Sequence, residues 1–222
     1  MSRPQLDREL GDRIAHLLQQ GVESRGYASL VVSGGSTPKG LFQVLSRKSI
    51  EWEKVHVTLA DERWVEVDSD QSNERFVREN LLQNRARTAR FLGLMNDRIS
   101  PEEGCAQAIS RLREIARPFD VVILGMGEDG HTCSWFPCSD EIDTVLTTRE
   151  VCVPVNPFTV SDPRLTISMS GILESRQIIV HIVGENKWFV YRKALKAESI
   201  QRTPISAVLR QTEVPVDVYW SV

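Results

Sequence analysis

An acid–imidazole pair follows a short apolar run near the middle of the chain. The run 121–124 is rich in β-branched residues, which predicts a buried strand. A glycine-rich segment follows at once and carries Asp129 and His131. An imidazole exchanges protons near neutral pH, and a neighbouring carboxylate can orient it. We therefore expect acid–base chemistry at the carboxyl end of a buried strand, where open α/β sheets build their sites.

The same segment also fits a dinucleotide fingerprint. Gly125, Gly127 and Gly130 match G-x-G-x-x-G after a strand. That fingerprint needs a helix beginning in the turn, but residues 131–137 lack a helical apolar period. Glu128 would also place negative charge beside a pyrophosphate. The dinucleotide interpretation is therefore disfavoured, and a loop histidine with no catalytic role stays the simplest alternative.

The cysteines near His131 suggest two further alternatives. Cys133 and Cys138 flank the loop, but with His131 they offer only three local zinc ligands, so no metal site is predicted. A Cys133–His131 nucleophile pair is disfavoured because side chains two residues apart tend to point apart. With Cys105 and Cys152 they form no Cys-x-x-Cys pair, and we expect reduced thiols in a cytoplasmic protein.

A second segment predicts phosphate binding. Gly34, Gly35, Ser36 and Thr37 follow a predicted strand at 27–32. A helix is expected next, with Ser36 or Thr37 as its cap and Pro38 at its first position. Free amides, a favourable dipole and hydroxyl groups meet at such a turn. Leu41 replaces the lysine of a Walker loop, so we expect a phosphorylated ligand but no nucleoside triphosphate. An ordinary capped turn is the alternative.

Three charged residues complete the candidate site. Asp61 and Arg63 lie where the predicted strand 55–60 becomes a loop. Lys187 lies in the first turn of a predicted helix, where a cation opposes the helix dipole unless an anion is near. Solvated surface charges are the alternative interpretation at these three positions.

Apolar periodicity places these residues on alternating strands and helices. Helices are predicted at 4–20 (ending at Gly21), from Pro38 onward, and at 74–82, 102–116, 185–197 and 204–209. Strands are predicted at 27–32, 55–60, 91–94, 120–124, 151–155, 164–169, 178–183 and 214–220. We expect one α/β domain over residues 1–222. It should contain a doubly wound, mainly parallel Rossmann-like sheet with helices on both faces, plus a small mixed C-terminal portion.

The composition is that of an ordinary globular protein. The 222 residues are 41% hydrophobic and 26% charged, with a formal net charge of -3. No basic block suggests nucleic acid, and no apolar run is long enough to span a membrane. The N-terminal segment lacks the apolar core of a signal peptide, which agrees with a cytoplasmic location.

Taken together, the motifs resemble the 6-phosphogluconolactonase family, within the wider glucosamine-6-phosphate isomerase-like superfamily. The resemblance covers nearly the whole chain. It rests on Ser33-Gly34-Gly35-Ser36-Thr37-Pro38, Asp61-Glu62-Arg63-Trp64-Val65, Ser72-Asn73, residues 124–137, Arg164-Leu165-Thr166, Gly184-x-x-Lys187 and Pro204-Ile205-Ser206-Ala207.

The resemblance implies a carboxylic ester hydrolase of the oxidative pentose phosphate pathway. Its substrate would be 6-phospho-D-glucono-1,5-lactone, and the enzyme would need no metal or organic cofactor. No macromolecular partner is implied, and the protein would be a monomer or a weak homo-oligomer. His131 would be the general base, held by Asp129. The implied substrate-binding residues are Gly34, Gly35, Ser36, Thr37, Asp61, Arg63, Arg164 and Lys187.

Two other functions stay open at this point. Glucosamine-6-phosphate deaminases share the phosphate loop, the aspartate at the position of Asp61 and the Asp-Gly-His turn. Their phosphate loop usually reads Thr-Gly-Ser, however, and they lack an Arg-Trp pair like that of Arg63 and Trp64. A sugar-phosphate-binding regulator without turnover is the second alternative, although it would have no need of Asp129 and His131.

Overall fold

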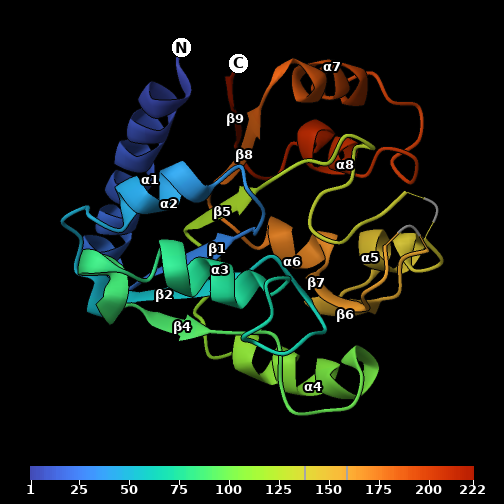
Figure 1. The fold of residues 1–222 in the computed structure, drawn as a ribbon, viewed down its shortest axis with the longest axis horizontal. Helices are drawn as coiled ribbons and strands as arrows, with labels where there is room; N and C mark the ends of the chain where they lie inside the picture. The colour runs from blue at the N-terminus through green and yellow to red at the C-terminus, as the bar shows by residue number, and fades with distance from the viewer. Residues whose placement is uncertain (138, 159) are drawn as a thin grey trace.

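A six-stranded parallel sheet forms the centre of the computed structural model, which describes residues 1–137, 139–158 and 160–222 (Figure 1). The strand order is β4-β2-β1-β5-β8-β9, and every neighbouring pair is parallel. The strands are β1 (Ala28–Val32), β2 (Val55–Leu59), β4 (Arg90–Leu92), β5 (Val121–Leu124), β8 (Ile178–Val183) and β9 (Val216–Ser221). The predicted doubly wound α/β fold is confirmed.

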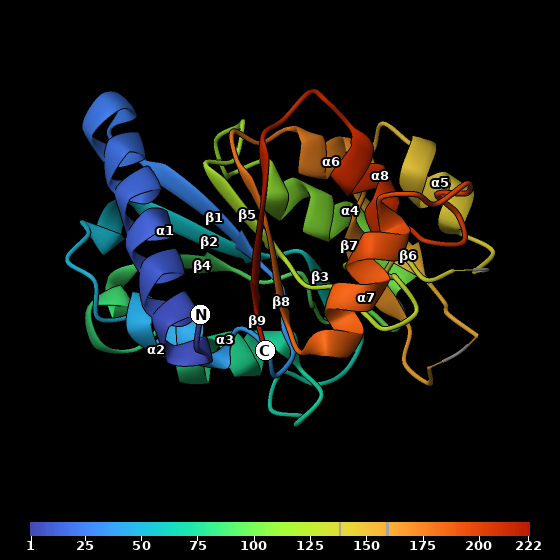
Figure 2. The same cartoon turned by 90° about the horizontal axis from the view of Figure 1, so that it is seen from above.

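Helices cover both faces of this sheet. Figure 2 shows α1 and α2 together on one side, with α4 and α6 on the other. The α-helices are α1 (Arg3–Arg25), α2 (Lys39–Leu45), α3 (Asn73–Asn80), α4 (Pro101–Leu112), α5 (Ile142–Thr147), α6 (Met169–Leu173), α7 (Glu185–Ala194) and α8 (Ile205–Arg210). Two short 3-10 helices are η1 (Trp52–Lys54) and η2 (Asn84–Thr88). The sequence did not predict α5, α6 or the 3-10 turns, because each is too short to show a period.

A second, three-stranded antiparallel sheet lies beside the main one, with the order β3-β7-β6. Its strands are β3 (Asp61–Arg63), β7 (Arg164–Ile167) and β6 (Cys152–Val155). The prediction of a loop at Asp61 and Arg63 was therefore wrong. After β2 the chain passes Ala60 and pairs again at once, and Ile167 N–H donates to the Ala60 carbonyl across this junction. Tertiary pairing supplies the strand, since three charged residues give no strand signal.

The first helix ends later than predicted. It continues past Gly21 to Arg25, and Gly26 ends it with a φ of +81°. Gly21 is inside the helix because the helix packs closely there: a Cβ would lie 3.0 Å from the Ala28 Cβ and 3.2 Å from the Asp120 Cγ. The close approach of α1 to the sheet, and not chain termination, explains this glycine.

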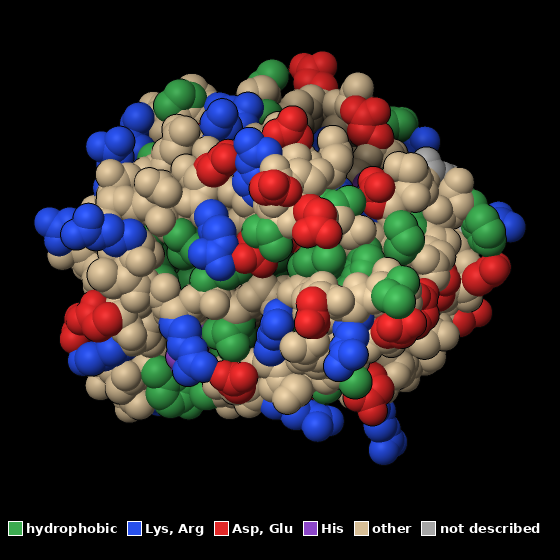
Figure 3. Space-filling model, turned by 60° about the horizontal axis from the view of Figure 1, so that its bottom comes forward, with side chains coloured by type: hydrophobic (Ala, Val, Ile, Leu, Met, Phe, Trp, Pro, Cys, Tyr) green, Lys and Arg blue, Asp and Glu red, His purple; other side chains and the backbone are tan. Residues whose placement is uncertain are grey.

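The buried apolar side chains form one continuous cluster that spans the sheet and the helices on both faces. The organisation of residues 1–222 as a single domain stays a prediction. No helix in the described part of the chain is long and apolar enough to cross a membrane. On the face shown in Figure 3, Lys and Arg side chains are interspersed with Asp and Glu side chains, so positive charge does not gather there. Cys105, Cys133 and Cys152 are free thiols, and Cys138 lies outside the described residues.

Candidate active site

A cavity of about 270 Å³ opens at the carboxyl ends of β1 and β5. The register sets this edge, since Val32 pairs with both Leu59 and Ile123 and the three strands end together. The predicted site residues that line the cavity are Gly34, Gly35, Ser36, Thr37, Asp61, Arg63, His131, Arg164 and Lys187. The structure thus brings together side chains from segments far apart in sequence. Their roles stay predictions.

His131 is held from two directions. Its Nδ1 lies 2.6 Å from Asp129 Oδ1, and its backbone N–H donates to the same oxygen at 3.1 Å. The Phe136 ring packs against the imidazole, with the ring centroids 4.6 Å apart. A Cβ at Gly127 would overlap the imidazole, so this glycine lets the ring fold back over its own loop. Asp129 is outside the cavity lining and contacts it through His131.

The Asp129 carboxylate is matched to this role. Burial opposes its ionisation, but the hydrogen bond and charge of His131 outweigh burial and hold the pKa of Asp129 below its ordinary value. The carboxylate therefore accepts the Nδ1 proton of the imidazole at neutral pH. With Nδ1 engaged, Nε2 is the nitrogen left to exchange a proton with a ligand.

The phosphate loop begins directly after β1. Gly35 has a φ of +89°, a conformation that side-chain-bearing residues rarely adopt. The predicted helix start was one residue early: α2 begins at Lys39, Pro38 precedes it, and no side chain caps it. The hydroxyls of Ser36 and Thr37 are thus not consumed by a helix cap. Arg3 on α1 holds the loop from behind, because its Nη2 donates to the carbonyls of Ser36 and Thr37 at 3.1 Å each.

Asp61 is a buried carboxylate on the cavity wall. Ser134 Oγ donates to Asp61 Oδ2 at 2.6 Å, and the Arg164 guanidinium lies 3.9 Å from the same oxygen. Asn73 Nδ2 donates to the Asp61 carbonyl at 2.9 Å. These contacts hold Asp61 beside the space for a ligand, and they compensate part of the free-energy cost of burying its carboxylate.

Two arginines face each other across the antiparallel sheet. Arg63 on β3 is the register partner of Arg164 on β7. Arg63 Nη1 donates to the Gln71 carbonyl at 2.7 Å and to Asn73 Oδ1 at 3.0 Å. The Arg164 guanidinium lies over the Phe136 ring, 5.2 Å from its centroid. This antiparallel pairing explains why residues a hundred positions apart reach one cavity.

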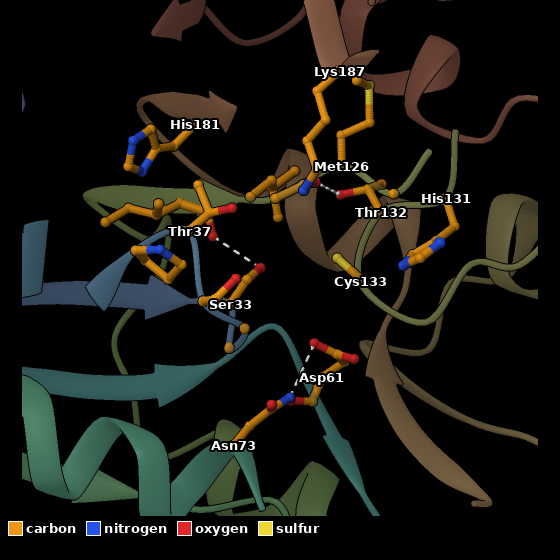
Figure 4. A pocket seen from close by; sticks show the side chains of 18 of the residues that line it. Ser33, Thr37, Asp61, Asn73, Met126, His131, Thr132, Cys133, His181 and Lys187 are labelled. Carbon is orange, nitrogen blue, oxygen red and sulfur yellow. Dashed lines mark hydrogen bonds between the residues drawn. The ribbon is translucent and has the colours of Figure 1, made fainter. Parts of the chain in front are cut away.

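Arg164 and Lys187 are partly desolvated cations that line the cavity. Burial lowers the pKa of Arg164, although Asp61 opposes this, and its buried Nε has no hydrogen-bond partner among the described residues. Burial also lowers the pKa of Lys187, against the charge of Glu128. Lys187 projects into the cavity from the first turn of α7 (Figure 4). Two partly desolvated cations beside a glycine–hydroxyl loop can bind an anion.

The structure adds residues that the sequence analysis did not place in the site. Asn73, Thr132, Cys133 and His181 also line the cavity. Figure 4 shows Asn73 beside Asp61, with Cys133 and Thr132 near His131. The Ser-Asn pair at a predicted helix start was the available signal for Asn73. His181 gave none, because it lies within an apolar strand.

The geometry disfavours Cys133 as a nucleophile, and the zinc alternative needs Cys138, which lies outside the described residues. Burial raises the pKa of the Cys133 thiol well above its ordinary value, with Asp61 adding to the effect, so Cys133 is a poor nucleophile. Within residues 1–137, 139–158 and 160–222, no three His, Cys, Asp or Glu side chains are grouped so that they could hold a metal ion. Trp135 is fully buried, and its Nε1 donates to the Ile167 carbonyl at 2.8 Å, so it packs and does not close over the cavity.

Sequence comparison identifies the relatives of this chain. The family described as glucosamine-6-phosphate isomerases/6-phosphogluconolactonase matches residues 2–220. The chain is 41% identical over 221 residues to a 6-phosphogluconolactonase of Mesorhizobium japonicum, covering 99% of this chain and 92% of that protein. It is 36% identical over 215 residues to that of Pseudomonas aeruginosa, covering 96% and 89%.

Solved structures agree with these relatives. The crystal structure of a 6-phosphogluconolactonase from Shewanella baltica superimposes with a TM-score of 0.98 at 56% identity, covering 100% of this chain and 96% of that one. A monomeric glucosamine-6-phosphate deaminase superimposes with a TM-score of 0.80 at 20% identity, covering 98% and 94%, which shows a shared fold alone. The resemblance inferred from the motifs is therefore confirmed, and this chain belongs to the glucosamine-6-phosphate isomerase/6-phosphogluconolactonase family.

Proposed function

We propose that this protein hydrolyses 6-phospho-D-glucono-1,5-lactone to 6-phospho-D-gluconate, with His131 as the general base. The relatives named 6-phosphogluconolactonase support the reaction. The observation that carries the assignment of His131 is the Asp129–His131 pair at the edge of a cavity that also holds the glycine–hydroxyl loop. A base and an anion site in one cavity fit a phosphorylated ester.

The chemistry needs two proton transfers by one group. His131 Nε2 accepts a proton from a water molecule as the water oxygen bonds to C1 of the lactone. The carbonyl oxygen gains negative charge, and the C1–ring oxygen bond then breaks. The imidazolium returns its proton to the departing ring oxygen, which leaves as the C5 hydroxyl. Asp129 stabilises the imidazolium between the two transfers and fixes its tautomer.

The substrate phosphate is assigned to the other part of the cavity. The loop residues Gly34, Gly35, Ser36 and Thr37 supply amides and hydroxyls, and Arg164 and Lys187 supply positive charge. Arg63 is available to the lactone oxygens, and Asp61 to the sugar hydroxyls. Water and protein groups suffice for this mechanism, and we propose that it operates in the cytoplasm in a monomer or weak homo-oligomer.

The test is hydrolysis of freshly prepared 6-phosphogluconolactone, with the spontaneous rate subtracted and glucosamine 6-phosphate run in parallel. The proposal predicts enzyme-dependent lactone hydrolysis without ammonia release from the amino sugar. Ammonia release would instead assign the protein to deamination. Binding of 6-phosphogluconate without turnover of either compound would make it a sugar-phosphate-binding protein.

A further inference from the structure

Asn73 contacts three parts of the site, which are the backbone of β3, the Arg63 side chain and the phosphate loop. It is the first residue of α3 and is buried. Its Nδ2 donates to the Asp61 carbonyl at 2.9 Å, and its Oδ1 accepts from Arg63 Nη1 at 3.0 Å. One amide group therefore fixes both the backbone of β3 and the direction of the Arg63 guanidinium.

The same amide also contacts the phosphate loop. A Cβ built on Gly34 would overlap Asn73 Oδ1, and its three nearest atoms would all belong to Asn73. The φ of Gly34 is outside the left-handed region, so the backbone itself accepts a side chain there. Gly34 is thus a glycine because the Asn73 side chain occupies the space of its Cβ.

Glu62 fixes Asn73 in turn. It is a buried carboxylate that does not line the cavity. Its Oε1 accepts from the backbone N–H groups of Arg63 and Asn73 at 2.8 Å each. Its Oε2 accepts from the Glu74 N–H at 2.7 Å and from Ser72 Oγ at 3.2 Å. Burial raises the pKa of Glu62 to about 7, and the hydrogen bonds from the backbone N–H groups oppose this rise. The Glu62 side chain thereby binds the first turn of α3 to β3.

We propose that Asn73, anchored by Glu62, is a positioning residue that aims Arg63 into the cavity and sets the distance between β3 and the phosphate loop. The kinetic consequence of this inference rests on the proposed function. The contacts of Asn73 with Arg63, the β3 backbone and Gly34 do not depend on any activity. A ligand phosphate and a lactone ring can occupy their subsites together only if this distance is held.

The kinetic test is a double-mutant cycle of N73A with R63M, read as lactone hydrolysis. Asn80, at the other end of α3, provides the matched control because its Nδ2 donates to the Phe76 carbonyl of its own helix. We expect N73A to lower kcat/KM by about 10–100-fold and N80A by less than about 3-fold. Because Asn73 acts in part through Arg63, N73A should lower kcat/KM by a smaller factor in the R63M background than in the wild type. Independent, multiplying losses would overturn the positioning role.

The conservative variant N73D sharpens this test. It keeps an oxygen that can accept from Arg63 but loses the donor to the Asp61 carbonyl. We expect N73D to retain more kcat/KM than N73A, whereas equal losses would contradict the contact with Arg63.

The second test uses thermal unfolding and needs no activity. G34A should lower Tm by about 3–8 °C, because its Cβ meets Asn73. In the N73A background the remaining Cβ of residue 73 lies 3.2 Å away, and G34A should cost less than about 2 °C. In the N80A background G34A should keep its full cost. An equal loss of Tm from G34A in all three backgrounds would refute the contact between Gly34 and Asn73. If the wild type does not hydrolyse the lactone, the proposed function is refuted, but the unfolding experiment still tests this contact.

Discussion

Asp129 Oδ1 lies 2.6 Å from His131 Nδ1, and it also accepts the backbone N–H of His131 at 3.1 Å. A single carboxylate oxygen therefore fixes both the ring and the chain that carries it. The consequence is one defined tautomer, with Nε2 left to act on a ligand. The proposed catalysis depends on this contact between Asp129 and His131.

Removing the carboxylate tests its contribution. D129N should lower kcat by about 10–100-fold with little change in KM, because the amide neither fixes the tautomer nor stabilises the imidazolium. Steady-state lactone hydrolysis measures both constants. The neighbouring variant E128Q is the control for kcat, since the contact with the imidazole comes from Asp129, whereas the charge of Glu128 acts on Lys187. A D129N enzyme with wild-type turnover would remove Asp129 from the mechanism.

Lys187 should act on the phosphate. K187M is expected to raise KM for the phosphorylated lactone by about 10–100-fold with a smaller change in kcat, because a charge-assisted contact is lost. K193M on the same helix is the matched control, since Lys193 lies 4.5 Å from the Phe189 ring centroid and outside this cavity. If glucono-1,5-lactone without the phosphate is hydrolysed as well as the natural substrate, the assignment fails.

Arg164 is assigned to the phosphate as well, although it also lies beside Asp61 and the Phe136 ring. R164M should raise KM at least about 10-fold, since it removes the charge and keeps most of the side-chain volume. Initial rates over a range of lactone concentrations separate the two constants. A fall in kcat at unchanged KM would instead place the guanidinium beside the lactone oxygens.

His181 makes a prediction about stability. Its side chain is buried, and Asp7 is 3.9 Å away. Burial, with the charges of Arg3 and Lys187, lowers the pKa of His181 to about 4. Between that value and its ordinary pKa, the unfolded chain binds the proton and the folded protein does not. Stability from this group is therefore complete above about pH 6.5 and is lost as the pH falls toward 4.

Urea unfolding of wild type and H181Q at several pH values measures this effect. The difference between the two proteins in unfolding free energy should change by roughly 3 kcal/mol between pH 6.5 and 4. H16Q, which alters an exposed histidine of α1, should follow wild type. A constant difference between wild type and H181Q across this range would show that His181 titrates equally in both states.

Local sequence patterns sufficed for much of the fold and the site. Buried strands such as Val121–Leu124 are apolar runs, and the loops after them carry the glycines and charges that predict a ligand. The pattern could not show that Asp61–Arg63 pairs with Arg164–Ile167, because that strand depends on its partner. Asn73 was missed as a site residue for the same reason: its contacts with Gly34 and Arg63 join segments distant in sequence.

The most direct test of the central claim is the hydrolysis rate of 6-phosphogluconolactone by H131A and wild type side by side, with the spontaneous rate subtracted. The account predicts a loss of about 10²–10⁴-fold in kcat at nearly unchanged KM. Circular dichroism and 6-phosphogluconate binding would establish that H131A is folded and has an intact site. An H131A enzyme that is folded, binds 6-phosphogluconate and turns over the lactone at the wild-type rate would contradict the assignment of His131 as the base.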